Sequence, residues 1–291
     1  MIGIKKIALI LLSTILCINS YCQYAAVSFY IVAHPDQWQL FMGNDAFNDI
    51  VKKTGNEQSK VMLIYTTAGD ESYNGNTPDP NHYLAREEGA RNSVEFCADI
   101  HGDHIPWVLD RILVRGHSIL KYTYKNVVSY LLRLPDGCNG NNISGQSLQL
   151  LHDSLVQSIT TVDSTTTYSG WADLDSTLRE IVGNEAANAP HLYFNTADAD
   201  TATNQGDDPD NIYAGKLCMD AIAGMQGISL KLFQENKIAN LPVNLNDKDI
   251  ATKAALLSQI DYVRTMRGLP TAWTTLNLMY LSRNYFRTIT K

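Results

Sequence analysis

The sequence predicts an α/β fold, a Rossmann-like three-layer sandwich with a mostly parallel central sheet. Short apolar segments rich in β-branched residues alternate along the chain with longer segments of helical pattern. Most of these strands are apolar on both faces, which is typical of a parallel sheet covered by helices on each side. In such sheets ligands bind at the carboxyl ends of the strands, so the loops at those ends are the candidate site.

The elements follow from hydrophobic periodicity and from turn-forming residues at their ends. The predicted strands span residues 25–32, 60–67, 127–134, 191–195 and 228–233. The predicted helices run from His82 through Glu95 or beyond, and over 147–159, 173–182, 211–225 and 248–266. Polar or turn-rich loops separate them, including 75–81, 137–145 and 196–210.

The N-terminus has the pattern of a secretory signal peptide. Lysines precede an apolar run over 7–18, and Ser20 and Cys22 are small residues suited to cleavage before Gln23. The apolar run is too short for a permanent membrane-spanning helix. We therefore expect a secreted or periplasmic protein. Lipid attachment at Cys17 or Cys22 is the less favoured alternative, because the residues before Cys22 are polar.

The predicted domain organisation is a signal peptide at 1–22 followed by a single domain at 23–291. The formal charge of the whole chain is −7, and it becomes about −9 without the signal peptide, which carries Lys5 and Lys6 and no acidic residue. An acidic protein lacks the electrostatic footprint of a binder of nucleic acid or of anionic membranes. No later segment is apolar enough to cross a membrane, so no stable span is expected after cleavage.

The cysteines Cys97, Cys138 and Cys218 remain after cleavage. An odd number permits at most one intramolecular disulfide among them. Their separations do not match a zinc module. We expect small, partly buried side chains.

Loops with reactive side chains follow several of the predicted strands. They are His-Pro-Asp-Gln at 34–37, Arg-Leu-Pro-Asp-Gly at 133–137 and Asp-Asp-Pro-Asp-Asn at 207–211. If the sheet is parallel, these loops meet at one edge. By itself, each is also compatible with an ordinary turn, with Asp36 or the acidic residues of 207–210 capping the next helix.

In this order, the motifs resemble the PIG-L (LmbE-like) family of zinc-dependent N-acetylglucosamine deacetylases. The resemblance extends from about residue 28 to residue 224. It rests on Ala33-His34-Pro35-Asp36, Thr66-Thr67-Ala68-Gly69-Asp70, Arg86-Glu87, Arg133-Leu134-Pro135-Asp136-Gly137 and Asp207-Asp208-Pro209-Asp210-Asn211.

The resemblance implies that an acetamide is hydrolysed with the help of zinc. His34 matches the first histidine ligand and Asp36 the general base. Gln37 and Asn211 stand at the other two ligand positions, where the family has Asp and His. Amide oxygens are poor zinc ligands because they carry no charge. The sequence therefore predicts weak zinc binding and slow or absent deacetylation.

The remaining site residues also come from the resemblance. Asp208 replaces a histidine that supports the oxyanion or the leaving amine. Asp210 matches the aspartate of the family motif, and we assign both aspartates to the catalytic group. Arg86 and Asp136 match positions on the substrate side of the cleft.

Two functions therefore remain open. The first is an exported hydrolase that acts on an N-acetylated sugar or glycoconjugate. The second is a glycan-binding pseudoenzyme on the same fold, which has lost catalysis. The carboxylates and amides are also compatible with calcium or magnesium.

Overall fold

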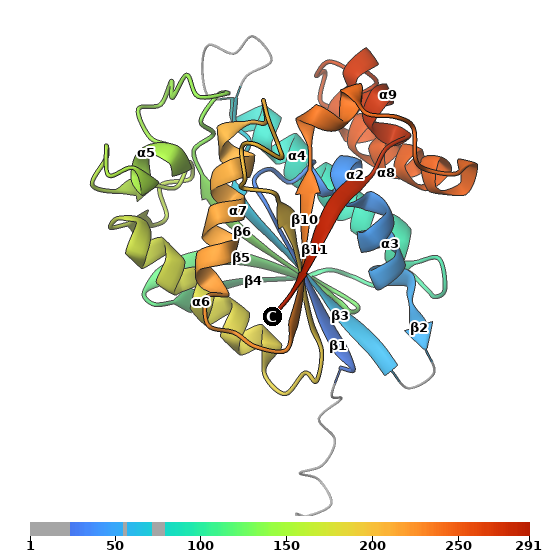
Figure 1. The fold of residues 1–291 in the computed structure, drawn as a ribbon, viewed down its shortest axis with the longest axis horizontal. Coiled ribbons are helices and arrows are strands. Elements are labelled where there is room, and N and C mark those ends of the chain that lie inside the picture. Colours follow the sequence, from blue (N-terminus) through green and yellow to red (C-terminus); the bar gives the residue numbers. More distant parts are fainter. Residues whose placement is uncertain (1–23, 55–56, 72–78) are drawn as a thin grey trace, which may run out of the picture.

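The structure is a computed structural model that describes residues 24–54, 57–71 and 79–291 (Figure 1). The predicted signal peptide lies outside these residues. The described chain forms an α/β structure with a mostly parallel central sheet flanked by helices, consistent with the predicted sandwich. Within it, no helix is both long and apolar enough to cross a bilayer.

The strands of the main sheet follow the order β11-β10-β9-β1-β3-β6-β5-β4. The central strands are parallel, and all of them were predicted. They are β1 (Ala26–Val32), β3 (Glu57–Thr67), β6 (Val127–Leu134), β9 (Leu192–Ala197) and β10 (Ile228–Gln234). Their pairing puts β1 at the centre, hydrogen-bonded to β3 on one side and to β9 on the other.

Antiparallel strands complete both edges, and the sequence analysis does not predict them. These strands are β4 (Val108–Val114), β5 (His117–Tyr124) and β11 (Tyr285–Thr290). Nearly all of β4 is exposed, so it lacks the apolar pattern of a buried strand. The hairpin turn between β4 and β5 places Arg115 and Gly116 in the left-handed region, at φ 52° and 86°. Short strands β2 (Lys53–Thr54), β7 (Ile159–Thr160) and β8 (Thr167–Tyr168) add to the periphery.

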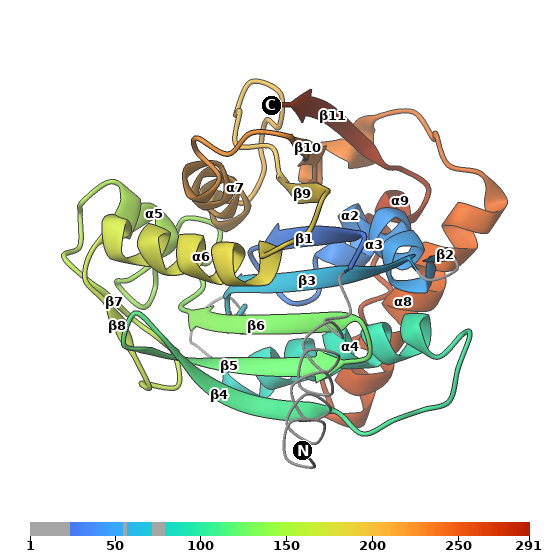
Figure 2. The same ribbon diagram turned by 90° about the horizontal axis from the view of Figure 1, so that it is seen from below.

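Helices cover the two faces of the sheet, each over its own apolar core (Figures 1 and 2). One face carries α5 (Leu148–His152), α6 (Trp171–Ala186) and α7 (Pro209–Ala221). The other carries α2 (Trp38–Phe41), α3 (Gly43–Val51), α4 (Pro80–Ala98), α8 (Asp247–Met266) and α9 (Thr275–Leu281). A 3-10 helix, η1 (Asn236–Asn240), follows β10. Cys97, Cys138 and Cys218 are buried free thiols.

The helix predicted over residues 147–159 is wrong in length. The structure has only α5 (Leu148–His152), because the chain turns at Asp153 and Ser154, the latter with φ 58°. Ile159 belongs to β7 instead. Ser and Asp favour turns because their side chains compete with the backbone for hydrogen bonds, so this polar stretch ends the helix.

The helix predicted to begin at Asn211 begins earlier, with Pro209 in its first turn. Asp208 is the N-cap, and its carboxylate accepts a hydrogen bond from the Asp210 N–H at 2.9 Å. Asp210 is therefore a helical residue with a fixed direction. Gly215 lets this helix approach the sheet, because a Cβ there would lie 2.4 Å from the Ala197 carbonyl oxygen.

Lys253 in α8 provides a pH-dependent test of the packing of α8 against the segment 280–283. Its buried ammonium donates to the carbonyls of Tyr280 and Arg283 at 2.6 and 2.5 Å, and burial lowers its pKa to about 7. An unfolded lysine titrates near 10.4, so between these values the unfolded chain binds more protons. We therefore expect Lys253 to make the protein more stable as the pH rises from about 7 to 9, by up to about 1.4 kcal/mol per pH unit.

The measurement is urea unfolding of the wild type and of Lys253→Met across this pH range. The free energy of unfolding of the wild type minus that of the variant should increase with pH, because the variant lacks the titrating amine. Parallel pH profiles for the two proteins would contradict the prediction.

Candidate metal centre and adjoining pocket

The candidate site lies at the point where the order of the parallel strands reverses. From β1 the chain passes to β3 and β6 on one side, whereas β9 and β10 extend the sheet on the other. The loops after β1 and β9 therefore lead to helices on opposite faces, and this position is the usual ligand site of such sheets. His34 follows β1, Asp136 follows β6, and Asp210 lies in the first turn of α7, after β9. The predicted convergence of the three loops is confirmed.

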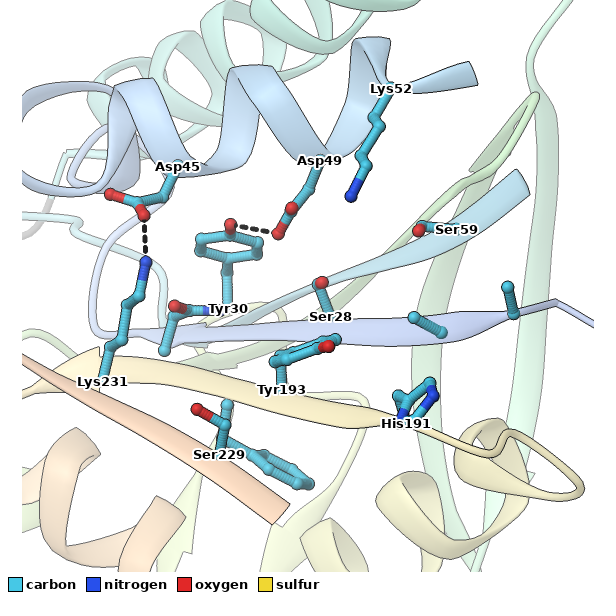
Figure 3. A pocket seen from close by; sticks show the side chains of 14 residues that line it. Ser28, Tyr30, Asp45, Asp49, Lys52, Ser59, His191, Tyr193, Ser229 and Lys231 are labelled. Carbon is cyan, nitrogen blue, oxygen red and sulfur yellow. Dashed lines mark hydrogen bonds and ion pairs between the residues drawn. The ribbon is translucent and has the colours of Figure 1, made fainter. Parts of the chain in front are cut away.

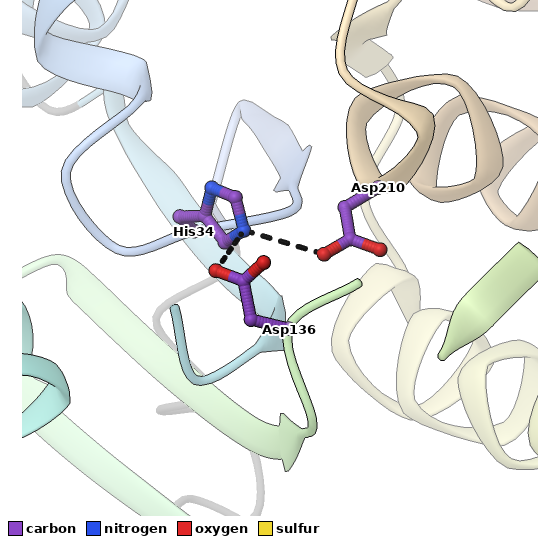
Figure 4. A group of neighbouring side chains, drawn as sticks. All are labelled: His34, Asp136 and Asp210. Carbon is purple, nitrogen blue, oxygen red and sulfur yellow. Dashed lines mark ion pairs between the residues drawn. The ribbon is translucent and has the colours of Figure 1, made fainter. Parts of the chain in front are cut away.

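His34, Asp136 and Asp210 form a buried group whose potential ligand atoms all lie within 4.8 Å of one another. His34 Nε2 is 3.1 Å from Asp136 Oδ2 and 3.4 Å from Asp210 Oδ2. Both carboxylates face the imidazole from different segments of the chain (Figure 4). This group can hold a metal ion.

The hydrogen bonding of the group supports this interpretation. Among the described residues, His34 Nε2, Asp136 Oδ2 and Asp210 Oδ1 are buried and have no hydrogen-bond partner of acceptable geometry. Buried polar atoms without partners are costly and rare. A cation between His34 Nε2 and Asp136 Oδ2 would satisfy both of these atoms, with Asp210 Oδ2 facing the same imidazole. A histidine with two carboxylates is a chemically suitable donor set for a divalent ion.

Without a cation, the same group favours a charged imidazole. Burial lowers the pKa of His34, but the Asp136 carboxylate, with Asp210, outweighs this effect and raises the pKa well above its usual value. Burial raises the pKa of Asp136, but His34 and Arg86 reverse this effect and hold it well below the usual range. Burial raises the pKa of Asp210. A metal ion that binds to this group would therefore displace a proton.

Backbone amides fix the two carboxylates. Asp136 Oδ1 accepts from the Cys138 N–H at 2.7 Å, and Asp210 Oδ2 accepts from the Gly137 N–H at 2.8 Å. The Asp136 N–H in turn donates to Asp70 Oδ1 at 2.8 Å. Gly137 is required here, because a Cβ at this position would lie 2.9 Å from Asp210 Oδ1.

Gln37 and Asn211, the predicted amide ligands, are bonded to each other. Gln37 Nε2 donates to Asn211 Oδ1, while Gln37 Oε1 accepts from the His34 N–H at 2.9 Å. Asn211 Nδ2 donates to Asp207 Oδ1, also at 2.9 Å. Both amide oxygens thus accept hydrogen bonds beside the group of His34, Asp136 and Asp210, and a ligand role for Gln37 or Asn211 stays a prediction.

Asp36, the predicted base, lies against Arg86, with 3.3 Å between Oδ1 and Nη1. Burial raises the pKa of Asp36, but Arg86 and His34 outweigh it, so the net shift is downward and the carboxylate is ionised. Gly69, at φ 65°, leaves room for Arg86, because a Cβ would lie 2.6 Å from Nη1. Asp208 is the helix cap described above, and burial raises its pKa to about 6.

His34, Asp36, Gln37 and Arg86 also line a pocket of about 270 Å³ that extends toward α8 and α9. Its polar end is next to the candidate metal site, because His34 belongs to both. Its other walls combine apolar side chains, such as Leu40, Phe41 and Leu257, with polar ones, such as Asn236, Thr271 and Asn277. The pocket can therefore accept a ligand that has both polar and apolar groups.

Arg264, in the last turn of α8, lines the same pocket and is missing from the predicted site. His82 Nε2 lies 3.0 Å from Arg264 Nη1, and Nδ1 contacts the Glu71 carbonyl. Because arginine only donates, Nε2 accepts and Nδ1 carries the proton. Burial lowers the pKa of His82 to about 4, which keeps the ring neutral for this role. No local motif in the sequence indicates Arg264.

Glu235 is a second residue that the sequence analysis missed. It is 1% exposed, and burial raises its pKa well above the usual value. It follows β10 directly, so the rule that sites lie at the carboxyl ends of strands gives the signal that could have found it. Its backbone N–H bonds Asn204 Oδ1 at 3.0 Å, and Asn204 Nδ2 bonds Asp207 Oδ2 at 2.6 Å.

Comparisons with known proteins give no assignment. The chain matches no protein-family model, and no curated protein or solved structure is similar enough to count as a match.

Proposed function

We propose that this chain is a metal-dependent amide hydrolase that removes the acetyl group from an N-acetylated sugar or glycoconjugate. The observation that carries the proposal is the buried group of His34, Asp136 and Asp210, with unpartnered donor atoms at the strand-order reversal. The order of the motifs resembles that of PIG-L deacetylases and supplies the substrate class.

Zinc is the proposed ion, held by His34, Asp136 and Asp210. Two carboxylates balance its charge, and the imidazole nitrogen favours zinc over calcium or magnesium, which prefer oxygen ligands. When bound, zinc would lower the pKa of a water molecule and polarise the acetamide carbonyl.

The chain's own residues supply the remaining functions. Asp36 is ionised and lies at the polar end of the pocket, so it is suited to take the proton of the attacking water. Arg86 holds Asp36 in place and adds positive charge at that end of the pocket.

The glycan-binding alternative is favoured by one specific observation. Gln37 and Asn211 form a neutral amide pair at two positions where the family has charged or imidazole ligands. The loss of two ligand positions would leave the pocket beside Gln37 able to bind an N-acetylated sugar without hydrolysing it.

The decisive experiment is zinc titration of the metal-free protein combined with a deacetylase assay on N-acetylglucosamine substrates. We expect His34→Ala, Asp136→Asn and Asp210→Asn each to weaken zinc binding by at least about a hundredfold, because removing a ligand costs more than removing its supporting partner. Asp36→Asn should retain zinc and lose hydrolysis.

Asp153→Asn, an exposed carboxylate outside the site, is the matched control and should change neither property. A wild-type protein that does not bind zinc would refute the hydrolase proposal. Zinc binding and sugar binding without turnover would favour the pseudoenzyme.

A further inference from the structure

We infer a second binding site, for a neutral saccharide unit, at the amino-terminal ends of β1, β9 and β10. A cavity of about 330 Å³ lies there between the sheet and α3 (Figure 3). Its wall includes Ala25, Ala26 and His191, which lie at or just before the starts of β1 and β9. The candidate metal site of His34, Asp136 and Asp210 lies beyond the opposite ends of the strands. The second site is therefore separate from the first.

The sheet face in this cavity is polar, which is unusual for central parallel strands. Two cross-strand rows carry the polar side chains. In the first row, Tyr193 pairs with Ser28 on one side and Ser229 on the other. In the second row, Asn195 has the corresponding neighbours Tyr30 and Lys231. On the next strand, β3, the partners of Ser28 and Tyr30 are apolar, and only Ser59, the partner of Ala26, adds a hydroxyl to the cavity.

Helix α3 forms the facing wall and carries charged side chains toward the sheet. Asp49 accepts from the Tyr30 hydroxyl at 2.6 Å, and Asp45 pairs with Lys231 at 2.5 Å. Lys52, at the end of α3, points into the same space (Figure 3). Two acidic and two basic side chains thus balance, and the cavity has no net charge.

A hydroxyl-rich, uncharged cavity fits a polyhydroxylated ligand better than an ion. Ser28, Ser59, Tyr193 and Ser229 can donate or accept hydrogen bonds by rotating their hydroxyls. Tyr193 is 43% exposed and combines an apolar ring with a polar tip, which suits the mixed surface of a sugar. The volume is at the lower end of the range for small-molecule sites, which corresponds to one sugar unit.

The test is ligand-observed NMR and calorimetric titration with glucose, galactose and mannose, which lack the acetamide group of the substrate proposed for the metal centre. At least one should bind with a dissociation constant in the millimolar range. Tyr193→Ala and Asp49→Asn should each weaken that binding by about tenfold or more, because the first removes the ring and the second a charged acceptor. Circular dichroism verifies that the variants are folded.

Tyr262→Ala removes another exposed tyrosine, on α8, and should leave sugar binding unchanged. Asp210→Asn should also leave it unchanged, whereas zinc binding should survive Tyr193→Ala. The inference is overturned if no sugar binds, if binding ignores both Tyr193 and Asp49, if Asp210→Asn abolishes it, or if the zwitterion glycine competes with the sugar. None of these results depends on whether the metal centre hydrolyses amides.

Discussion

Arg133→Met is expected to destabilise the protein by about 3–5 kcal/mol, because it leaves a buried charge without its partner. Arg133 makes a bidentate pair with Glu87, with both nitrogen–oxygen distances at 2.7 Å, and also bonds Asp163 at 2.9 Å. The Glu87 side chain is only 5% exposed. Arg133 lies three residues before Asp136, so the variant should also weaken metal binding.

The matched control is Arg115→Met. Arg115 has nearly the same backbone conformation, at φ 52° against 54° for Arg133, but its pair with Glu180 is exposed and 4.0 Å long. This control should cost less than about 1 kcal/mol. Urea unfolding measures both variants. Equal losses would contradict the idea that burial of Glu87 makes the difference.

The pH dependence provides a second check on the Arg133→Met result. Burial raises the pKa of Glu87, and Arg133 opposes this rise. Without Arg133, the pKa of Glu87 in the folded protein should rise further above its value in the unfolded chain. The folded protein therefore binds a proton at Glu87 more readily than the unfolded chain does. The destabilisation should therefore be largest at neutral pH and shrink as the pH falls and Glu87 becomes protonated.

The sequence predicts the centre of the fold better than its edges, for a physical reason. Central parallel strands such as β1 and β6 are buried on both faces, so their apolar runs are visible without any knowledge of their neighbours. Strand β4 is mostly exposed and is held by backbone pairing with β5. Backbone pairing leaves little trace in side-chain pattern, so this strand could not be found in the same way.

The same contrast applies to the candidate site. His34 and Asp136 could be chosen because they lie in motifs directly after β1 and β6. That Asp136 turns toward His34 and Asp210 depends on bonds to Cys138 and Asp70 that form only in the folded chain. Arg264 reaches the pocket from a helix distant in the sequence and is aligned by His82. Such tertiary contacts have no local signature.

The double variant Gln37→Asp with Asn211→His is expected to bind zinc far more tightly than either single variant. In the structure the two side chains bond each other beside His34, so each single change leaves an unmatched partner. Residues in direct contact show coupled effects rather than additive ones. Asp207, now 2.9 Å from Asn211 Nδ2, is placed to accept a hydrogen bond from the new ring and orient it.

Competitive zinc titration of the wild type, the two single variants and the double variant measures this coupling. Asn244→His adds an exposed imidazole outside the site and should leave the affinity unchanged, which separates a site effect from a generic histidine effect. Asp208→His should raise the rate of turnover further, because the acidic side chain at position 208 now caps α7 instead of offering a donor to the substrate. Strictly additive gains in zinc affinity would show that positions 37 and 211 do not act on one ion.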